Sequence, residues 1–268
     1  KDTTDWEKFE KWAETVPYTF RNPLYHWTHL ELKTAFGINE TLNPTNARKI
    51  FDKCNELIAT EERFCPRGLM AHYNVETVCT TDDPADTLEW HKIVADDPTA
   101  KTRMLPTWRP DAGMNIEAAT WKSYIEKLEK VSGVEIKKFA DLVNALQKRH
   151  DFFAEMGCRL SDHGIEEFYD EPYPEAEIDA IMDKALAGTA LTTEETRKYK
   201  HAYMFEQGVM DCKSGWTQQY HYGAIRNNNS KMFAQLGADT GFDSIGEFTT
   251  AKAMSPFVDE LNSKGCLA

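Results

Sequence analysis

Apolar side chains recur at intervals of three and four residues in several stretches of the chain. This is the spacing of one face of an α-helix, so each stretch predicts an amphipathic helix. The stretches lie at residues 6–16, 50–58, 121–131 and 139–153.

Helix-start signals precede three of the expected helices. Pro44 follows an asparagine and Pro84 follows an aspartate, and proline is favoured at the first position of a helix. Thr192 and Glu195 have the spacing of a capping box. We therefore expect helices that begin at Pro44, at Pro84 and just after Thr192.

Short runs of β-branched and aromatic residues lie between the helices. They predict strands at residues 75–81, 103–108, 158–161 and 216–222. Strands that alternate with helices indicate βαβ units and a parallel sheet. No glycine-rich phosphate loop follows any of them, which disfavours a dinucleotide-binding or P-loop fold.

Each predicted strand ends in polar side chains, as strands do at the functional face of a (β/α)8 barrel. The predicted fold is therefore α/β, a TIM barrel, although a doubly wound sheet could present a similar pattern. Residues 1–70 contain no clear strand and are expected to form a helical insertion or cap. Residues 71–268 are expected to form the barrel part.

Composition limits the class of partner. The net charge of −13 argues against nucleic acid, because phosphate binding needs a basic surface. The six cysteines show no CxxC pair, which favours free thiols in a reducing cytoplasm over a disulfide or zinc framework. No apolar run approaches the ~20 residues of a membrane span, and no signal peptide is visible. The sequence leaves the oligomeric state open, a homo-oligomer included.

Arg109 follows the second predicted strand, in the sequence Trp-Arg-Pro-Asp. A guanidinium binds two carboxylate oxygens at once, so Arg109 is a candidate clamp for an acidic substrate. The alternative is a surface ion pair between Arg109 and Asp111, which would stabilise the fold by less than about 1 kcal/mol.

Asp162 and His163 are adjacent at the end of the third predicted strand. Adjacent strand residues point to opposite faces, so only one of them faces a site unless the chain has already turned. Asp162 is the preferred site residue; a structural and a direct role for His163 are both open.

His221 lies among glutamines, a tyrosine and Arg226, a setting more polar than a core histidine requires. It is the best candidate for acid–base chemistry or substrate binding. Arg226 is a candidate substrate contact, and the asparagines at 227–229 are expected to cap the next helix.

A second group of histidines and aromatic residues lies at residues 22–29. His26 and His29 are three residues apart, which would suit a metal on one helical face but occurs more often in packing. Contact between a sugar ring and Tyr25, His26 or Trp27 is the better interpretation.

Taken together, five motifs resemble those of uronate (glucuronate) isomerase, a family of the amidohydrolase superfamily. The resemblance covers essentially the whole chain, in the family's order. The motifs are Asn-Pro-Leu-Tyr-His-Trp-Thr-His-Leu-Glu-Leu at 22–32, Thr-Trp-Arg-Pro-Asp at 107–111, Cys-Arg-Leu-Ser-Asp-His-Gly at 158–164, Gly-Ala-Ile-Arg-Asn-Asn-Asn at 223–229 and Gly-Ala-Asp-Thr-Gly-Phe-Asp-Ser-Ile-Gly at 237–246.

The resemblance implies an amidohydrolase-type barrel with a helical insertion, and an enzyme that interconverts D-glucuronate with D-fructuronate and D-galacturonate with D-tagaturonate. Arg109, Asp162 and His221 match positions that the family places in its active site. A metal-dependent hydrolase on the same barrel and a non-catalytic sugar-acid binding protein are the alternatives.

The resemblance also implies a divalent metal, with zinc expected. In the family the metal ligands lie on the first and last strands, outside the four strands predicted here, so no metal ligand is assigned in this chain. The chain is therefore expected to be a central, partial barrel of a longer enzyme, and to be inactive alone.

Overall fold

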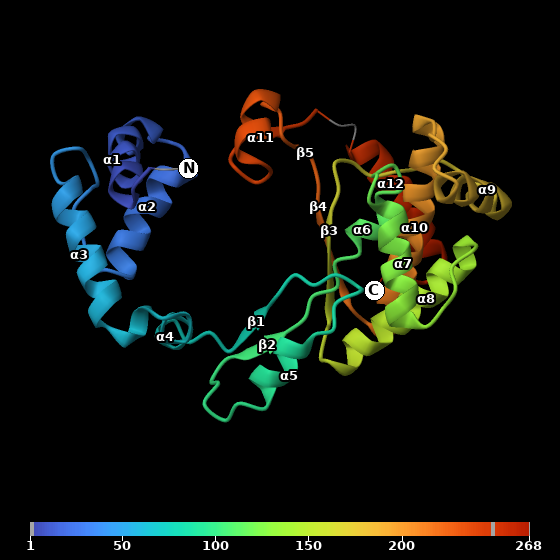
Figure 1. Ribbon diagram of the computed structural model, residues 1–268, viewed down its shortest axis with the longest axis horizontal. Coiled ribbons are helices and arrows are strands. Elements are labelled where there is room, and N and C mark those ends of the chain that lie inside the picture. The colour runs from blue at the N-terminus through green and yellow to red at the C-terminus, as the bar shows by residue number, and fades with distance from the viewer. Residues whose placement is uncertain (1–2, 248–249, 268) are drawn as a thin grey trace. The chain divides into compact units, whose positions relative to one another are not determined.

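The computed structural model describes residues 3–247 and 250–267 (Figure 1). The chain forms two compact units. The first runs to Glu76 and includes Ala100–Thr102, and the second contains Thr77–Thr99 and the chain from Arg103 on. Within the described residues, no helix has the length and apolar character that crossing a bilayer requires.

The first unit is helical. A capping box formed by Thr4 and Glu7 begins its first helix, and the ring of Trp6 packs edge-on against Phe51 of the third helix at 5.3 Å. Ala13, Val16 and Ile50 are among its buried core residues. Its elements are α1 (Asp5–Thr15), η1 (Val16–Thr19), α2 (Pro23–Thr34), α3 (Ala47–Thr60), η2 (Glu62–Phe64) and α4 (Pro66–His72).

Four parallel strand segments organise the second unit. β1 (Thr77–Cys79) pairs with β2 (Arg103–Leu105), and β3 (Leu160–Gly164) pairs with β4 (Thr217–His221). Trp108, just beyond β2, bridges in parallel to both Asp82 and Ser161. The chain therefore places the four segments side by side in sequence order, as expected for parallel strands joined by helical crossovers.

Helices connect these strands and cover one side of β3 and β4, where α7, α8, α10 and α12 gather (Figure 1). A short antiparallel pair, β5 (Ala224–Ile225) and β6 (Ser244–Ile245), follows β4. The helices are α5 (Glu89–Ala95), α6 (Asp111–Met114), α7 (Trp121–Ser132), α8 (Phe139–Glu155), α9 (Glu175–Leu186), α10 (Thr193–Ser214), α11 (Ser230–Leu236) and α12 (Thr250–Ser263).

The core of the second unit lies between the strands and the covering helices. Trp108, Trp121, Phe153, Tyr199 and Tyr203 are all but fully buried there. Trp108 donates its indole N–H to Gln207 of α10, at 2.8 Å, and its ring meets Phe153 of α8 edge-on. Because Trp108 points to the helices, the next residue, Arg109, is directed to the opposite face of the sheet.

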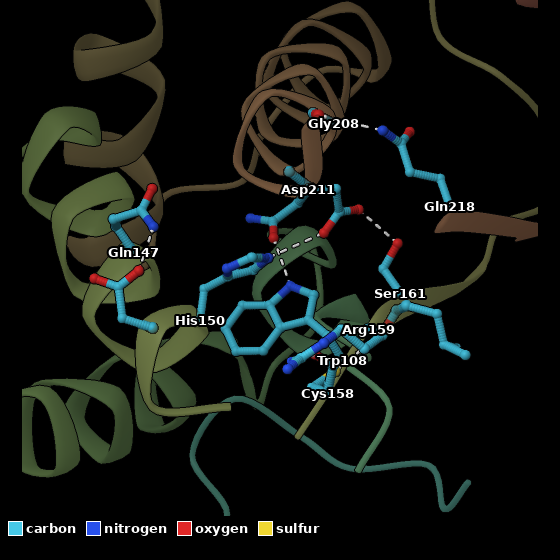
Figure 2. A network of polar contacts seen from close by, with 12 residues as sticks. Trp108, Gln147, His150, Cys158, Arg159, Ser161, Gly208, Asp211 and Gln218 are labelled. Carbon is cyan, nitrogen blue, oxygen red and sulfur yellow. Dashed lines mark hydrogen bonds and ion pairs between the residues drawn. The ribbon is translucent and has the colours of Figure 1, made fainter. Parts of the chain in front are cut away.

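Polar contacts join the strands to α8 and α10 (Figure 2). Asp211 of α10 is fully buried; it accepts a hydrogen bond from Ser161 Oγ at 2.6 Å and lies 3.0 Å from His150 Nε2. Gln218 of β4 donates to the Gly208 carbonyl of α10. Since buried polar groups require partners, this network fixes which face of β3 and β4 meets the helices.

Two predicted helix starts were wrong. The helices begin at Ala47 and Glu89, not at Pro44 and Pro84. The reason is local: the side chains of Asn43 and Asp83 accept the backbone N–H two residues on, which closes a turn around each proline. The start after Thr192 is confirmed, with the capping box to Glu195 formed.

Strand limits also differ from those expected. β1 and β2 are shorter than their predictions, whereas β3 runs through Gly164. Asp162 and His163 therefore lie within a strand, not after it, and they point to opposite faces. All six cysteines are free thiols, as expected.

Candidate active site

Arg109 anchors a group of charged side chains on the face of the sheet opposite the helices. Its backbone N–H bonds to the Asp82 carbonyl, which continues the ladder beyond β2. Its guanidinium donates from Nη1 to Asp162 Oδ2 at 3.0 Å and from Nε to Asp111 Oδ2 at 2.9 Å. Hydrogen bonds between charged partners are stronger than neutral ones, so these two contacts hold the side chain firmly.

The charge of Arg109 is secure. Partial burial lowers its pKa, but the hydrogen bond and charge of Asp111 and the charge of Asp162 outweigh that effect and raise the pKa above its ordinary value. The pair with Asp111 does form, yet these side chains are only 30% and 20% exposed. Arg109 is thus bound to two carboxylates of this chain, and its ion pair with Asp111 is partly buried.

Asp162 joins Arg109 to His221. Its side chain is 9% exposed, and its Oδ1 lies 3.2 Å from Nδ1 of His221. The two atoms are at ion-pair distance but not aligned for a hydrogen bond, and within the described residues Asp162 Oδ1 has no hydrogen-bond partner. A buried carboxylate oxygen requires a donor, and Nδ1 of His221 at 3.2 Å can supply one if the imidazole turns into alignment.

His221, at the end of β4, is the third residue in this series of contacts. Its side chain is 60% exposed, and the residue lies in register with Gly164 of β3. The three predicted catalytic residues therefore come together in one row, from residues beside or within β2, β3 and β4. A cation, a carboxylate and an imidazole in contact can bind an anionic ligand and move a proton.

His163 has the structural surroundings of a packing residue. It is 2% exposed, its Nε2 lies 3.0 Å from Ser161 Oγ, and its ring stacks on Tyr220. Burial lowers its pKa below the ordinary value, which keeps the imidazole neutral. Of the two roles left open by the sequence, this geometry favours the structural one.

Arg226 lies apart from that row of contacts. It is about half exposed and donates from Nη1 to Asp243 Oδ2 at 2.6 Å. The same carboxylate accepts the N–H of Asn227. Asn229 caps α11 through Met232 N, as the sequence predicted. A substrate contact by Arg226 stays a prediction.

Tyr25 and His26 lie on α2 in the first unit, and their role in substrate binding also stays a prediction. His29 is occupied structurally: its Nε2 accepts the N–H of Leu42 at 3.0 Å, and its Nδ1 donates to the Tyr25 carbonyl at 2.7 Å. Because both ring nitrogens are used, the geometry disfavours a metal at the His26 and His29 pair.

Within the described residues, no three His, Cys, Asp or Glu side chains gather closely enough to hold an ion.

Three residues that lie beside Arg109, Asp162 and His221 were not predicted from the sequence as site residues. Asp111 was considered only as a surface partner, and Gly164 and Gln219 were not singled out. Gln219 lies opposite Asp162 in the β3–β4 register and is exposed. Strand alternation from His221 could have identified Gln219, whereas the contact of Gly164 with Arg109 depends on the tertiary structure.

A family model described as glucuronate isomerase matches residues 1–268. The chain belongs to this family. Its sequence is 66% identical to the uronate isomerase of Phocaeicola vulgatus and 65% identical to that of Bacteroides thetaiotaomicron, over 268 residues in each case. Those matches cover the whole chain and 57% of each relative, so the chain spans little more than half the length of these relatives.

Solved glucuronate and uronate isomerases share the fold. The uronate isomerase of Thermotoga maritima matches with a TM-score of 0.89 at 32% identity, over 98% of this chain and 58% of that one. The glucuronate isomerase of Caulobacter crescentus matches with a TM-score of 0.88 at 25% identity, over 100% of this chain and 55% of that one. The prediction of a partial TIM barrel of the amidohydrolase type is confirmed.

Proposed function

We propose that this chain contributes to an aldose–ketose isomerase that interconverts D-glucuronate with D-fructuronate and D-galacturonate with D-tagaturonate. Two facts support the proposal: membership of the glucuronate isomerase family and the row of Arg109, Asp162 and His221. The row is the observation that carries it, because it joins an anion-binding group to two groups able to exchange protons.

The reaction moves two hydrogens and leaves the overall composition of the sugar unchanged. The proton on C2 leaves and a proton arrives at C1, while the O2 proton is lost and the former carbonyl oxygen O1 gains one. The enediol between the two sugars carries developing negative charge on oxygen, and fixed donors stabilise such charge. Arg109 supplies these donors or holds the uronate carboxylate, and Asp162 and His221 assist the proton movement.

Several finer points belong to the proposal. Tyr25, His26 and Arg226 are proposed to contact the substrate, and residues 1–70 to form a cap on a barrel part at 71–268. A divalent metal, with zinc expected, would polarise the substrate carbonyl in this family. Its ligands are proposed to lie outside this chain. A cytoplasmic location, a small uronate substrate and the absence of nucleic acid or membrane partners stay predictions.

The test is an assay for ketose formation from D-glucuronate, run on the full-length protein that contains this chain, with added zinc. We expect turnover, and we expect His221→Asn to lower kcat/KM by about 10²- to 10⁴-fold, the usual contribution of an acid–base group. His72→Asn, on α4 in the first unit, is the matched control and should leave kcat/KM unchanged.

The same assay separates the alternatives. Binding of D-glucuronate without turnover by the intact protein would support a sugar-acid binding protein and contradict the isomerase. Hydrolysis of a sugar derivative without ketose formation would support a metal-dependent hydrolase. Residues 1–268 alone, assayed in parallel, test the prediction that this chain has no activity by itself.

A further inference from the structure

Asp111 connects two strand ends through a single oxygen. Its Oδ2 accepts one hydrogen bond from Arg109 Nε at 2.9 Å and another from the backbone N–H of Gly164 at 3.0 Å. Arg109 follows β2, and Gly164 ends β3. The carboxylate therefore ties the arginine to the strand that carries Asp162.

Three contacts together fix the guanidinium. Asp111 bonds Nε, Asp162 bonds Nη1, and the Cα of Gly164 lies so close that a Cβ built there would be 2.5 Å from Nη2. A planar guanidinium bound at two of its edges has both its position and its rotation determined. Without the Nε contact, the Nη1 bond to Asp162 would leave the group free to pivot.

Besides the second N–H of Nη1, this arrangement leaves Nη2 as a remaining donor. Within the described residues, neither of its N–H groups has a hydrogen-bond partner, and the Arg109 side chain is 30% exposed. The donors of Nη2 are thus available to a ligand, in a direction set by the two carboxylates.

We propose that Asp111 is a positioning residue, which orients the Arg109 guanidinium so that Nη1 meets Asp162 and Nη2 faces the substrate. The inference rests on the proposed isomerase function and extends it to a residue that does not itself touch the substrate.

The test uses the full-length protein and D-glucuronate turnover. We expect Asp111→Ala to lower kcat/KM by about 100-fold, the size of effect that misplacing a catalytic contact by about 1 Å produces. We expect Asp111→Asn to stay within about tenfold of the wild type, because its amide oxygen can accept both N–H groups. Asp52→Ala is the control: Asp52 makes the same contact, Oδ2 to Arg48 Nε at 3.0 Å, on the exposed side of α3.

Two further measurements distinguish positioning from a merely structural role. Added formate should restore at least a tenth of wild-type kcat/KM to Asp111→Ala, and should not restore activity to Arg109→Ala. Asp111→Glu, which keeps the charge but displaces the oxygens, should lose more activity than Asp111→Asn. Wild-type kcat/KM in Asp111→Ala would overturn the proposal. So would an Asp111→Glu variant that is more active than Asp111→Asn.

A crystal structure of Asp111→Ala decides the inference independently of turnover. Arg109 displaced from Asp162 supports it, and an unchanged Arg109–Asp162 contact overturns it even if activity is lost. If the wild type forms no ketose, the proposed function fails while this structural outcome still stands. If Asp111→Ala does not fold, the structure and kinetics of Asp111→Glu give the same decision.

Discussion

Gly164→Ala is expected to damage catalysis while leaving the fold intact. The new Cβ would lie 2.5 Å from Arg109 Nη2, against an ordinary contact of about 3.5 Å. The guanidinium must therefore withdraw by about 1 Å. Because Nη1 belongs to the same rigid group, its 3.0 Å bond to Asp162 would lengthen to about 4 Å, which is beyond hydrogen-bond range.

The expected loss of kcat/KM follows from the lost hydrogen bond between Arg109 and Asp162. A hydrogen bond between charged partners contributes about 1.5–3 kcal/mol, which corresponds to roughly 10- to 150-fold in kcat/KM if the contact is made in the transition state. The free energy of unfolding should fall by up to about the same 1.5–3 kcal/mol, because the lost bond also stabilises the folded state; the replacement of glycine by alanine in a strand offsets part of that loss.

Gly133→Ala is the complementary control. Gly133 ends α7 with φ of +67°, and nothing lies within 4 Å of a Cβ built there. Left-handed backbone costs an alanine about 1–2 kcal/mol, so this variant should be less stable with unchanged kcat/KM. Urea unfolding and D-glucuronate turnover measure the two quantities. The reasoning is refuted if Gly164→Ala keeps wild-type kcat/KM, or if both variants lose activity in proportion to their loss of stability.

Three other predictions concern stability. Burial lowers the pKa of His163, so as the pH falls the unfolded chain takes up the proton before the folded chain does. The free energy of unfolding should therefore be unaffected above about pH 6.5 and should fall below it, by up to about 1.4 kcal/mol per pH unit. Urea unfolding followed against pH should show a steeper fall in the wild type than in His163→Gln. Asp211→Leu removes the acceptor of Ser161 Oγ, which keeps only its contact with His163, and removes the hydrogen-bond partner of His150 Nε2; it should cost about 2–5 kcal/mol in the same measurement, and a cost under about 1 kcal/mol would mean that the network is replaceable. Thr192→Ala removes the α10 cap and should lower the free energy of unfolding by about 1 kcal/mol, with Thr192→Ser close to the wild type; equal losses in both variants would contradict a capping role.

Local chemistry determined much of this protein. Helical periodicity and the Thr192–Glu195 box predicted α7, α8 and α10, because each depends on residues within one or two turns. Alternation of strands and helices predicted the parallel arrangement, and polar residues at the strand ends brought Arg109, Asp162 and His221 forward as candidates. These features can be predicted from the sequence, since they arise from interactions between residues that lie close together along the chain.

Only the tertiary structure decided how those candidates meet. β3 continues through Gly164 because β4 supplies its hydrogen-bond partners, and this pairing sends His163 to the helices and Asp162 to Arg109. Asp111 and Gly164 are 53 residues apart in sequence, so no local pattern could reveal that one binds the other. The register of the strands and the face to which each side chain points are set by contacts between segments far apart in sequence, and local sequence patterns do not predict those contacts.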